Sequence, residues 1–87
     1  MTLTEGKNYF IRTVTHYYTG KLVGFTEEDL VLVEAAWIAD TGRFANFLES
    51  GKAQEVEPYP AKAKVFVSRG AVIDVSEWAH PLPREQK

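Results

Sequence analysis

Few residues in this chain have the chemistry of an active site. Cysteine is absent, which excludes disulfides, thiolate catalysis and cysteine-ligated metal sites. The two histidines, His16 and His80, have no second histidine or carboxylate at a metal-ligand spacing. The hydroxyls of Thr41 and Ser68 lie in glycine-containing turns, but no base that could orient them as nucleophiles is recognisable. The sequence therefore predicts a protein that is not an enzyme and that holds no metal or cofactor.

The polar side chains best suited to bind a ligand belong to two turns. Arg69, which precedes Gly70, can contact a phosphate or stack on a nucleic-acid base. The other turn is acidic and contains Glu27, Glu28 and Asp29. Its negative charges would repel a nucleic-acid backbone. The simpler interpretation of this acidic turn is a solvated connection between strands.

The composition favours one small domain. With 87 residues, the chain is near the lower end of the size at which a domain buries its own core, so oligomerisation would help to stabilise it. We expect a single domain over residues 1–87, with mobile ends at 1–7 and 81–87. Ten Lys and Arg against twelve Asp and Glu give a net charge of −2. Any nucleic-acid binding must therefore come from a local patch.

The hydropathy of the chain indicates a protein that is not inserted in a membrane. No stretch approaches the roughly 20 apolar residues that a membrane span requires, and residues 1–7 lack the apolar core of a signal peptide. At 45% hydrophobic residues, the chain is also too rich in core-forming side chains to be disordered. We therefore expect a folded, cytoplasmic protein.

Runs of β-branched and aromatic residues predict five strands and two hairpins. The predicted strands cover residues 8–18, 22–25, 30–38, 63–68 and 71–75. A tight turn at 19–21 precedes the second strand, since its glycine tolerates a positive φ. The third strand is a long apolar run that we expect to be buried on both faces. The last two strands flank Arg69 and Gly70 and are predicted to form the second hairpin.

In the segment between the third and fourth strands, the spacing of the apolar residues is that of a helix rather than that of a strand. Its apolar residues recur at helical spacing, at Phe44, Phe47 and Leu48. They predict a short helix that Thr41 could cap and Gly51 could end. Residues 52–61 are polar and contain two prolines, so we predict a loop or extended connection rather than a ladder strand. We expect the helix to pack on its own sheet; on an open face it would instead bind a partner.

The order of these elements resembles that of the Sm/Lsm family of ring-forming proteins. In that family, a bent strand with a glycine leads into the longest apolar strand, and an arginine or lysine followed by glycine separates the last two strands. The matching residues here are Leu22, Gly24, Leu30 and Leu32, then Val67, Arg69, Gly70, Val72 and Val75. The resemblance covers about half of the chain. It implies a mainly β fold, a five-stranded and strongly bent antiparallel barrel of Sm-like or SH3-like type, with a short helix inserted between strands three and four.

Three features depart from the family pattern. The asparagine and aspartate that hold a base between the second and third strands are replaced by the turn at 26–29. The N-terminal helix is missing or reduced to a few residues, and residues 39–62 form a longer insert. Such departures are typical of divergent Sm-like proteins, including phage-encoded ones. The resemblance would place the protein in the cytoplasm of a bacterium or of a virus-infected cell.

The resemblance implies a homo-oligomeric ring of five to seven subunits. Family members leave their last two strands as open edges, and exposed apolar edges pair unless they are covered. The interface residues would be Val65, Phe66, Val67, Val72, Ile73 and Val75. The alternative is a monomer in which the insert at 39–62 covers these edges.

Two functions are compatible with such a ring. The first, implied by the resemblance, is an RNA-binding or RNA-chaperone role with single-stranded RNA as the partner. Its contact residues would be Arg69, Gly70, Thr26 and Asp29. The second is a structural or protein-interaction ring, such as a phage-related assembly part, which binds no nucleic acid. The acidic turn favours the second function.

Overall fold

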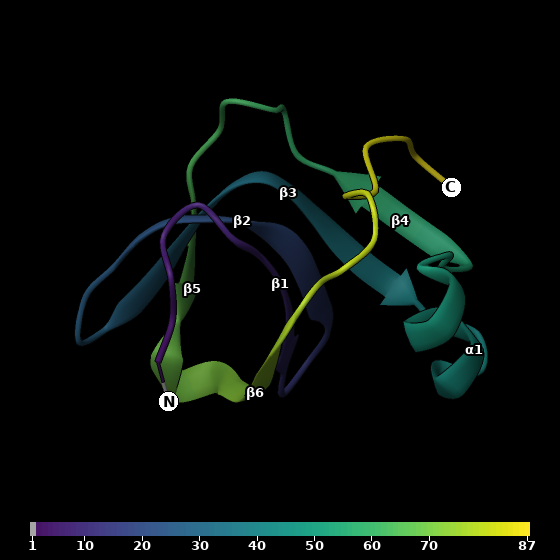
Figure 1. Ribbon diagram of the computed structural model, residues 1–87, viewed down its shortest axis with the longest axis horizontal. Helices are drawn as coiled ribbons and strands as arrows, with labels where there is room; N and C mark the ends of the chain where they lie inside the picture. Colours follow the sequence, from purple (N-terminus) through teal and green to yellow (C-terminus); the bar gives the residue numbers. More distant parts are fainter. Residues whose placement is uncertain (1) are drawn as a thin grey trace.

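The computed structural model describes residues 2–87, which form six antiparallel strands and one α-helix (Figure 1). The strands are β1 (Asn8–Thr13), β2 (Tyr17–Phe25), β3 (Asp29–Asp40), β4 (Glu55–Pro58), β5 (Val65–Ser68) and β6 (Val72–Glu77). The helix α1 (Phe44–Ser50) lies between β3 and β4, and the 3-10 helix η1 (Arg69–Ala71) joins β5 to β6. The predicted mainly β class, with a short helix inserted after the third strand, is confirmed.

The strands form one sheet in the order β4-β3-β2-β1-β6, and β5 also pairs with β3. Because β3 is 12 residues long, its first half pairs with β5 and its second half with β4. Within residues 2–87, β5 and β6 do not pair with each other, so the bent sheet remains open between them. The predicted hairpin of the last two strands is therefore wrong, since β5 pairs with β3 and β6 with β1.

Apolar clusters cover both faces of the sheet. The inner cluster contains Tyr9, Ile11, Leu22, Leu30, Leu32, Ala35, Val65 and Val67. The outer cluster contains Phe10, Ala36, Ile38, Phe47, Ala53, Val56 and Trp78. Consecutive residues of β1 enter different clusters because side chains alternate between the faces of a strand. A chain of this size thus buries apolar side chains on two sides of a single sheet.

The alternation of side chains along β3 changes phase at Glu34. This residue has a φ of 49°, and the pairing register with β2 shifts beside it. As a result, Leu32 belongs to the inner cluster whereas Ala36 and Ile38 belong to the outer one. The two clusters confirm the expected burial of this strand on both faces. A regular alternation of side chains would place Leu32, Ala36 and Ile38 on one face, which is wrong because the alternation is interrupted at Glu34.

The first strand ends earlier than predicted. The hydroxyl of Thr13 donates to the carbonyl of His16 (2.6 Å) and accepts from its N–H (3.2 Å), which closes a turn between β1 and β2. The prediction of one strand over 8–18 is therefore wrong. The predicted turn at 19–21 is wrong as well, because these residues lie inside β2. A Cβ on Gly20 would come within 3.1 Å of the Cβ of Leu32, so glycine allows β2 to approach β3 closely.

The predicted helix is present and packs on its own sheet, as expected. Phe47 is fully buried in the outer cluster, and Gly51 ends α1 in the left-handed conformation with a φ of 74°. The N-cap residue is Arg43, so the predicted cap at Thr41 is wrong. The aromatic rings of Phe47 and Trp78 lie 5.1 Å apart between centroids, which places Trp78 on the outer face of the sheet.

The loop predicted over residues 52–61 is wrong for its central part. Glu55–Pro58 form β4, which pairs with the second half of β3, and Val56 is buried in the outer cluster. Pro58 ends the strand, and β4 is an edge strand, where proline is tolerated.

Backbone hydrogen bonds connect both end segments, residues 2–7 and 81–87, to the sheet. The N–H of Gly6 donates to the carbonyl of Leu22 at 2.7 Å. Near the other end, Lys87 and Val56 exchange two backbone hydrogen bonds of 2.9 and 3.0 Å. Met1 lies outside the described residues. Within residues 2–87, no helix has the length and apolar character needed to cross a membrane.

Candidate binding site and open strand edges

The structure brings the two predicted polar turns together. The N–H of Arg69 donates to the carbonyl of Glu28 at 2.8 Å, and Asp29 lies opposite Ser68 in the β3–β5 register. Thr26 closes the β2–β3 turn, because its hydroxyl oxygen accepts from the N–H groups of Glu28 and Asp29 at 3.1 and 3.0 Å. Thr26, Asp29 and Arg69, which the sequence analysis assigned to one site, therefore lie in one region.

Gly70 follows Arg69 within η1. The nearest atom that a Cβ on Gly70 would meet is the hydroxyl oxygen of Ser68, at 3.7 Å. This separation is an ordinary van der Waals contact, so packing does not require glycine at this position. The polar character of the site comes from Arg69.

Arg69 is a partly buried cation without a carboxylate partner. Its guanidinium carbon lies 5.6 Å from the centroid of the Phe25 ring, within the range of a cation–π interaction. Its Nε is shielded from solvent and has no hydrogen-bond partner among residues 2–87. In this described part of the chain, the ion pairs join Lys7 to Glu77 and Arg12 to Asp74. Arg69 therefore retains donor capacity that a ligand could use.

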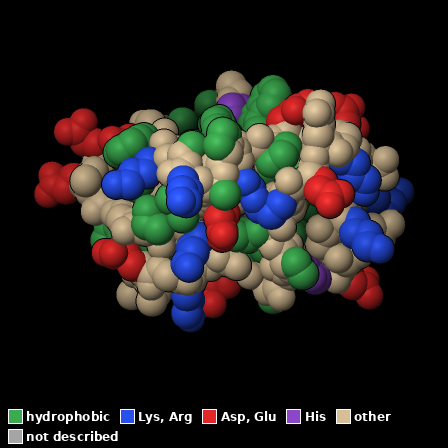
Figure 2. Space-filling view, turned by 90° about the horizontal axis from the view of Figure 1, so that it is seen from above, with side chains coloured by type: hydrophobic (Ala, Val, Ile, Leu, Met, Phe, Trp, Pro, Cys, Tyr) green, Lys and Arg blue, Asp and Glu red, His purple; other side chains and the backbone are tan. Residues whose placement is uncertain are grey.

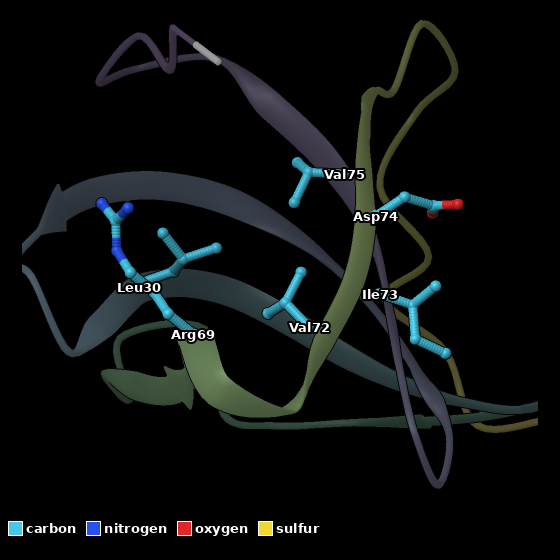
Figure 3. Close-up of a pocket in the computed structure, with 6 residues that line it drawn as sticks. All are labelled: Leu30, Arg69, Val72, Ile73, Asp74 and Val75. Carbon is cyan, nitrogen blue, oxygen red and sulfur yellow. The ribbon is translucent and has the colours of Figure 1, made fainter.

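A cavity of about 410 Å³ extends from Arg69 along β6. Its lining residues are Leu30, Arg69, Val72, Ile73, Asp74 and Val75. Figure 3 shows that Leu30, Val72 and Val75 project to the same side of β6 as the Arg69 guanidinium. The side chains of Ile73 and Asp74 point to the opposite side. The side chains on this inner side of β6 are thus apolar, apart from the positively charged Arg69.

The surroundings of Arg69 on the outside of the molecule are acidic. Arg69 and Glu27 line a shallow hollow with Phe25 and Thr26. Figure 2 shows acidic side chains at the end of the molecule where Figure 1 places the β2–β3 turn. Glu27 and Glu28 of this turn are exposed. A polyanion that approached Arg69 from this side would meet their negative charges.

The last two strands of the chain, β5 and β6, each have an open edge among the described residues. β5 pairs only with β3 and β6 only with β1 among the described residues. Each strand presents a large apolar side chain to solvent: Phe66 is 63% exposed and Ile73 59%. The insert at 39–62 does not cover these edges, since β4 pairs with β3 and Phe47 of α1 packs in the outer cluster.

The six predicted interface residues differ in exposure. Val65 and Val67 are buried in the inner cluster, and Val72 and Val75 are half-buried against it. Phe66 and Ile73 alone among the six are exposed. These two residues are therefore the available apolar contacts on the open strands.

The histidines have structural surroundings. The ring of His16 makes edge contacts with Tyr18 and Trp37 at centroid distances of 4.7 and 4.8 Å, and burial lowers its pKa. A ring nitrogen of His80 lies 2.8 Å from the carbonyl oxygen of Leu48. No group of three or more histidine or acidic side chains within residues 2–87 is arranged to hold a metal ion.

In comparisons with protein-family models, with curated proteins and with solved structures, nothing matches this chain. The fold is an open, bent antiparallel sheet in which β4, β5 and β6 each pair with one other strand among residues 2–87.

The cavity is a feature that the sequence analysis missed. Its apolar wall comes from β3 and β6, which are far apart in the chain, and its position depends on the gap between β5 and β6. Arg69 was the one signal in the sequence, because a cation that directly follows an apolar strand at a turn is a candidate ligand group.

Proposed function

We propose that the protein assembles through its open β5 and β6 edges into a closed homo-oligomeric ring that serves as a structural or protein-interaction module. The observation that carries this proposal is that, among residues 2–87, β5 and β6 are each unpaired on one side and each expose a large apolar residue. An exposed apolar edge is a site for pairing with another chain. A cyclic assembly satisfies every such edge. The resemblance to the Sm/Lsm family implies the same pairing between neighbours.

Side-chain alternation supports a specific contact between copies. Phe66 lies between two residues of the inner cluster and so points to the outer face of β5. Ile73 likewise points away from the inner side of β6 (Figure 3). If β5 of one copy pairs with β6 of the next, both side chains lie on the outer face of the joint sheet. Full burial of either would contribute about 1.5–3 kcal/mol.

RNA binding is the second candidate function, supported by the meeting of Arg69 with the β2–β3 turn. One observation favours the structural function over it: Glu27 and Glu28, which neighbour Arg69, are exposed. In a ring, every subunit would repeat these negative charges near the same site and repel a phosphate backbone.

Native mass spectrometry of protein purified without nuclease, combined with sedimentation velocity, tests both functions. We expect a closed ring of five to seven subunits without RNA mass. Phe66→Glu and Ile73→Lys should each shift the protein to monomers, because each places a charge in an apolar contact. The matched control is Val14→Glu, since Val14 is 71% exposed but lies in the β1–β2 turn. The double variant Phe66→Glu/Ile73→Lys should recover assembly, because opposite charges would then meet across strands.

A wild-type protein that sediments as a monomer at micromolar concentration would contradict the proposed assembly. A ring that carries RNA mass, lost after Arg69→Ala and at high salt, would instead favour the second function.

A further inference from the structure

We propose that the cavity between β3 and β6 binds a small aliphatic carboxylic acid, with Arg69 as the anchor of the carboxylate. This inference goes beyond the proposed assembly, because it assigns a ligand to Arg69 and to the inner side of β6, where Val72 and Val75 project, although Ile73 of the proposed contact between copies also lines the cavity. It requires neither a ring nor RNA.

The charge of the site selects a carboxylate. A guanidinium has five N–H donors in a planar fork that matches the two oxygens of a carboxylate. Arg69 has no ion pair within residues 2–87, and its shielded Nε has no acceptor there. The acidic residue that lines the cavity, Asp74, points to the other side of β6 and is bound by Arg12. An incoming carboxylate would therefore meet one uncompensated cation.

The side chains that line the cavity favour a ligand with an aliphatic hydrocarbon chain. Leu30, Val72 and Val75 face the cavity, and its volume of about 410 Å³ lies near the lower end of the range for small-ligand sites. The side chains of this wall, apart from Arg69, offer no charged partner for a second phosphate, and unpaired polar groups are costly to bury. The acidic β2–β3 turn also disfavours polyanions far more than an acid with a single charge.

The position of the cavity favours a free acid over the end of a peptide. A peptide that placed its C-terminal carboxylate on Arg69 would also lie along the open edge of β6. A free acid needs only the cavity and Arg69, so it would leave that edge available.

Calorimetric titration of the full-length protein with octanoate, and with octanol as an uncharged probe of equal chain length, tests the proposal. We expect octanoate to bind at least about tenfold more tightly than octanol, as a charge-assisted hydrogen bond in a partly buried site would give. Arg69→Gln should abolish this preference and Arg69→Lys should retain part of it. The matched control is Arg43→Gln, because Arg43 is an exposed cation at the start of α1 and should leave the preference unchanged. Val75→Phe should fill the cavity and weaken the binding of both probes.

Three outcomes would overturn the proposal: no octanoate binding at millimolar concentration, equal affinity for octanoate and octanol, or an unchanged preference in Arg69→Gln. A further arm uses a tetrapeptide that ends in leucine, with a free carboxylate or as the amide. Binding of the free peptide without binding of octanoate would also overturn the proposal, in favour of peptide docking. Sedimentation of the same samples reports assembly separately, so loss of the ring and loss of the acid site are distinguishable.

Discussion

Two arginines next to β6 show how the surroundings of a cation decide its role. Arg12 donates from Nε to a carboxylate oxygen of Asp74 at 2.9 Å, and its guanidinium lies 5.6 Å from the Phe44 ring centroid. Arg69 has a similar aromatic neighbour but no carboxylate partner in residues 2–87. Arg12 therefore joins β1 to β6 as a structural residue, whereas Arg69 has no ion pair among residues 2–87.

The Arg12–Asp74 pair should make the stability of the fold depend on pH. The hydrogen bond from Arg12 lowers the pKa of the Asp74 carboxyl below its value of 3.8 in the unfolded chain. The unfolded state therefore binds more protons as the pH falls. The contribution of the pair is present above about pH 4 and is lost as the pH falls through the lower pKa of the folded state. We expect Asp74→Asn to be less stable than the wild type at pH 6, and this difference to shrink as the pH falls below about 4.

Urea unfolding at a series of pH values measures this difference. It should be small, because both side chains are partly exposed and solvent screens their interaction. Glu49→Gln is the control, since Glu49 is an exposed helical acid outside the described ion pairs. A constant difference between Asp74→Asn and the wild type from pH 6 to pH 2 would contradict the assignment.

At the scale of elements, the sequence predicts best where one local signal decides the structure. The acidic turn at 26–29 and the helical spacing of Phe44 and Phe47 correctly predict the β2–β3 hairpin and α1. The turn after Thr13 is missed because it contains neither glycine nor proline and depends on a threonine hydroxyl. β4 is missed because a four-residue edge strand ending at Pro58 has too few apolar residues to show a period.

Two glycines of β2 should respond differently to alanine. A Cβ on Gly20 would lie 3.1 Å from side-chain atoms of Leu32 and 3.4 Å from the Cα of Ala35, whose carbonyl accepts from the N–H of Tyr59. We expect Gly20→Ala to lower the free energy of unfolding by about 1–3 kcal/mol, the usual effect of overpacking. A Cβ on Gly24 would meet no heavy atom of the described residues within 4 Å. Gly24→Ala should therefore change stability by no more than about 0.5 kcal/mol.

Thermal or urea unfolding of both variants measures the contrast. The resemblance to the Sm/Lsm family implies a bend of the second strand at Gly24, and the register of β2 does shift beside it. A larger loss in Gly24→Ala than in Gly20→Ala would mean that bending, rather than close approach to β3, determines where glycine is needed.

At the scale of the whole molecule, β3 organises the fold because it pairs with β2, β4 and β5 and contributes to both apolar clusters. The sequence reveals its length and apolar character but not the phase change at Glu34, which depends on the pairing with β2. The candidate site, too, can be predicted from the sequence only in part. Arg69 and Thr26 can be identified from their turns, whereas the cavity depends on contacts between distant strands.

The C-terminal segment fastens β3 to the chain that follows β4. The guanidinium of Arg84 donates to the carbonyl of Ala35 at 2.9 Å and to that of Tyr59 at 2.6 Å. Arg84→Ala would remove the donor to the carbonyl of Tyr59, whereas the carbonyl of Ala35 would still accept from the N–H of Tyr59; we expect a cost of about 1–3 kcal/mol of stability. Lys87→Ala is the control, because Lys87 contributes its backbone to the pairing with Val56 and alanine keeps that backbone.

Urea unfolding gives the loss of global stability, and amide hydrogen exchange at Val56 reports local opening, since its N–H donates to the carbonyl of Lys87. We expect Arg84→Ala to accelerate this exchange more than Lys87→Ala does. Equal exchange in the two variants would mean that the segment is held by Leu82, which packs against the outer cluster, rather than by Arg84. The distinction matters for the whole fold, because the same segment continues from Trp78 and so links the outer cluster to β6.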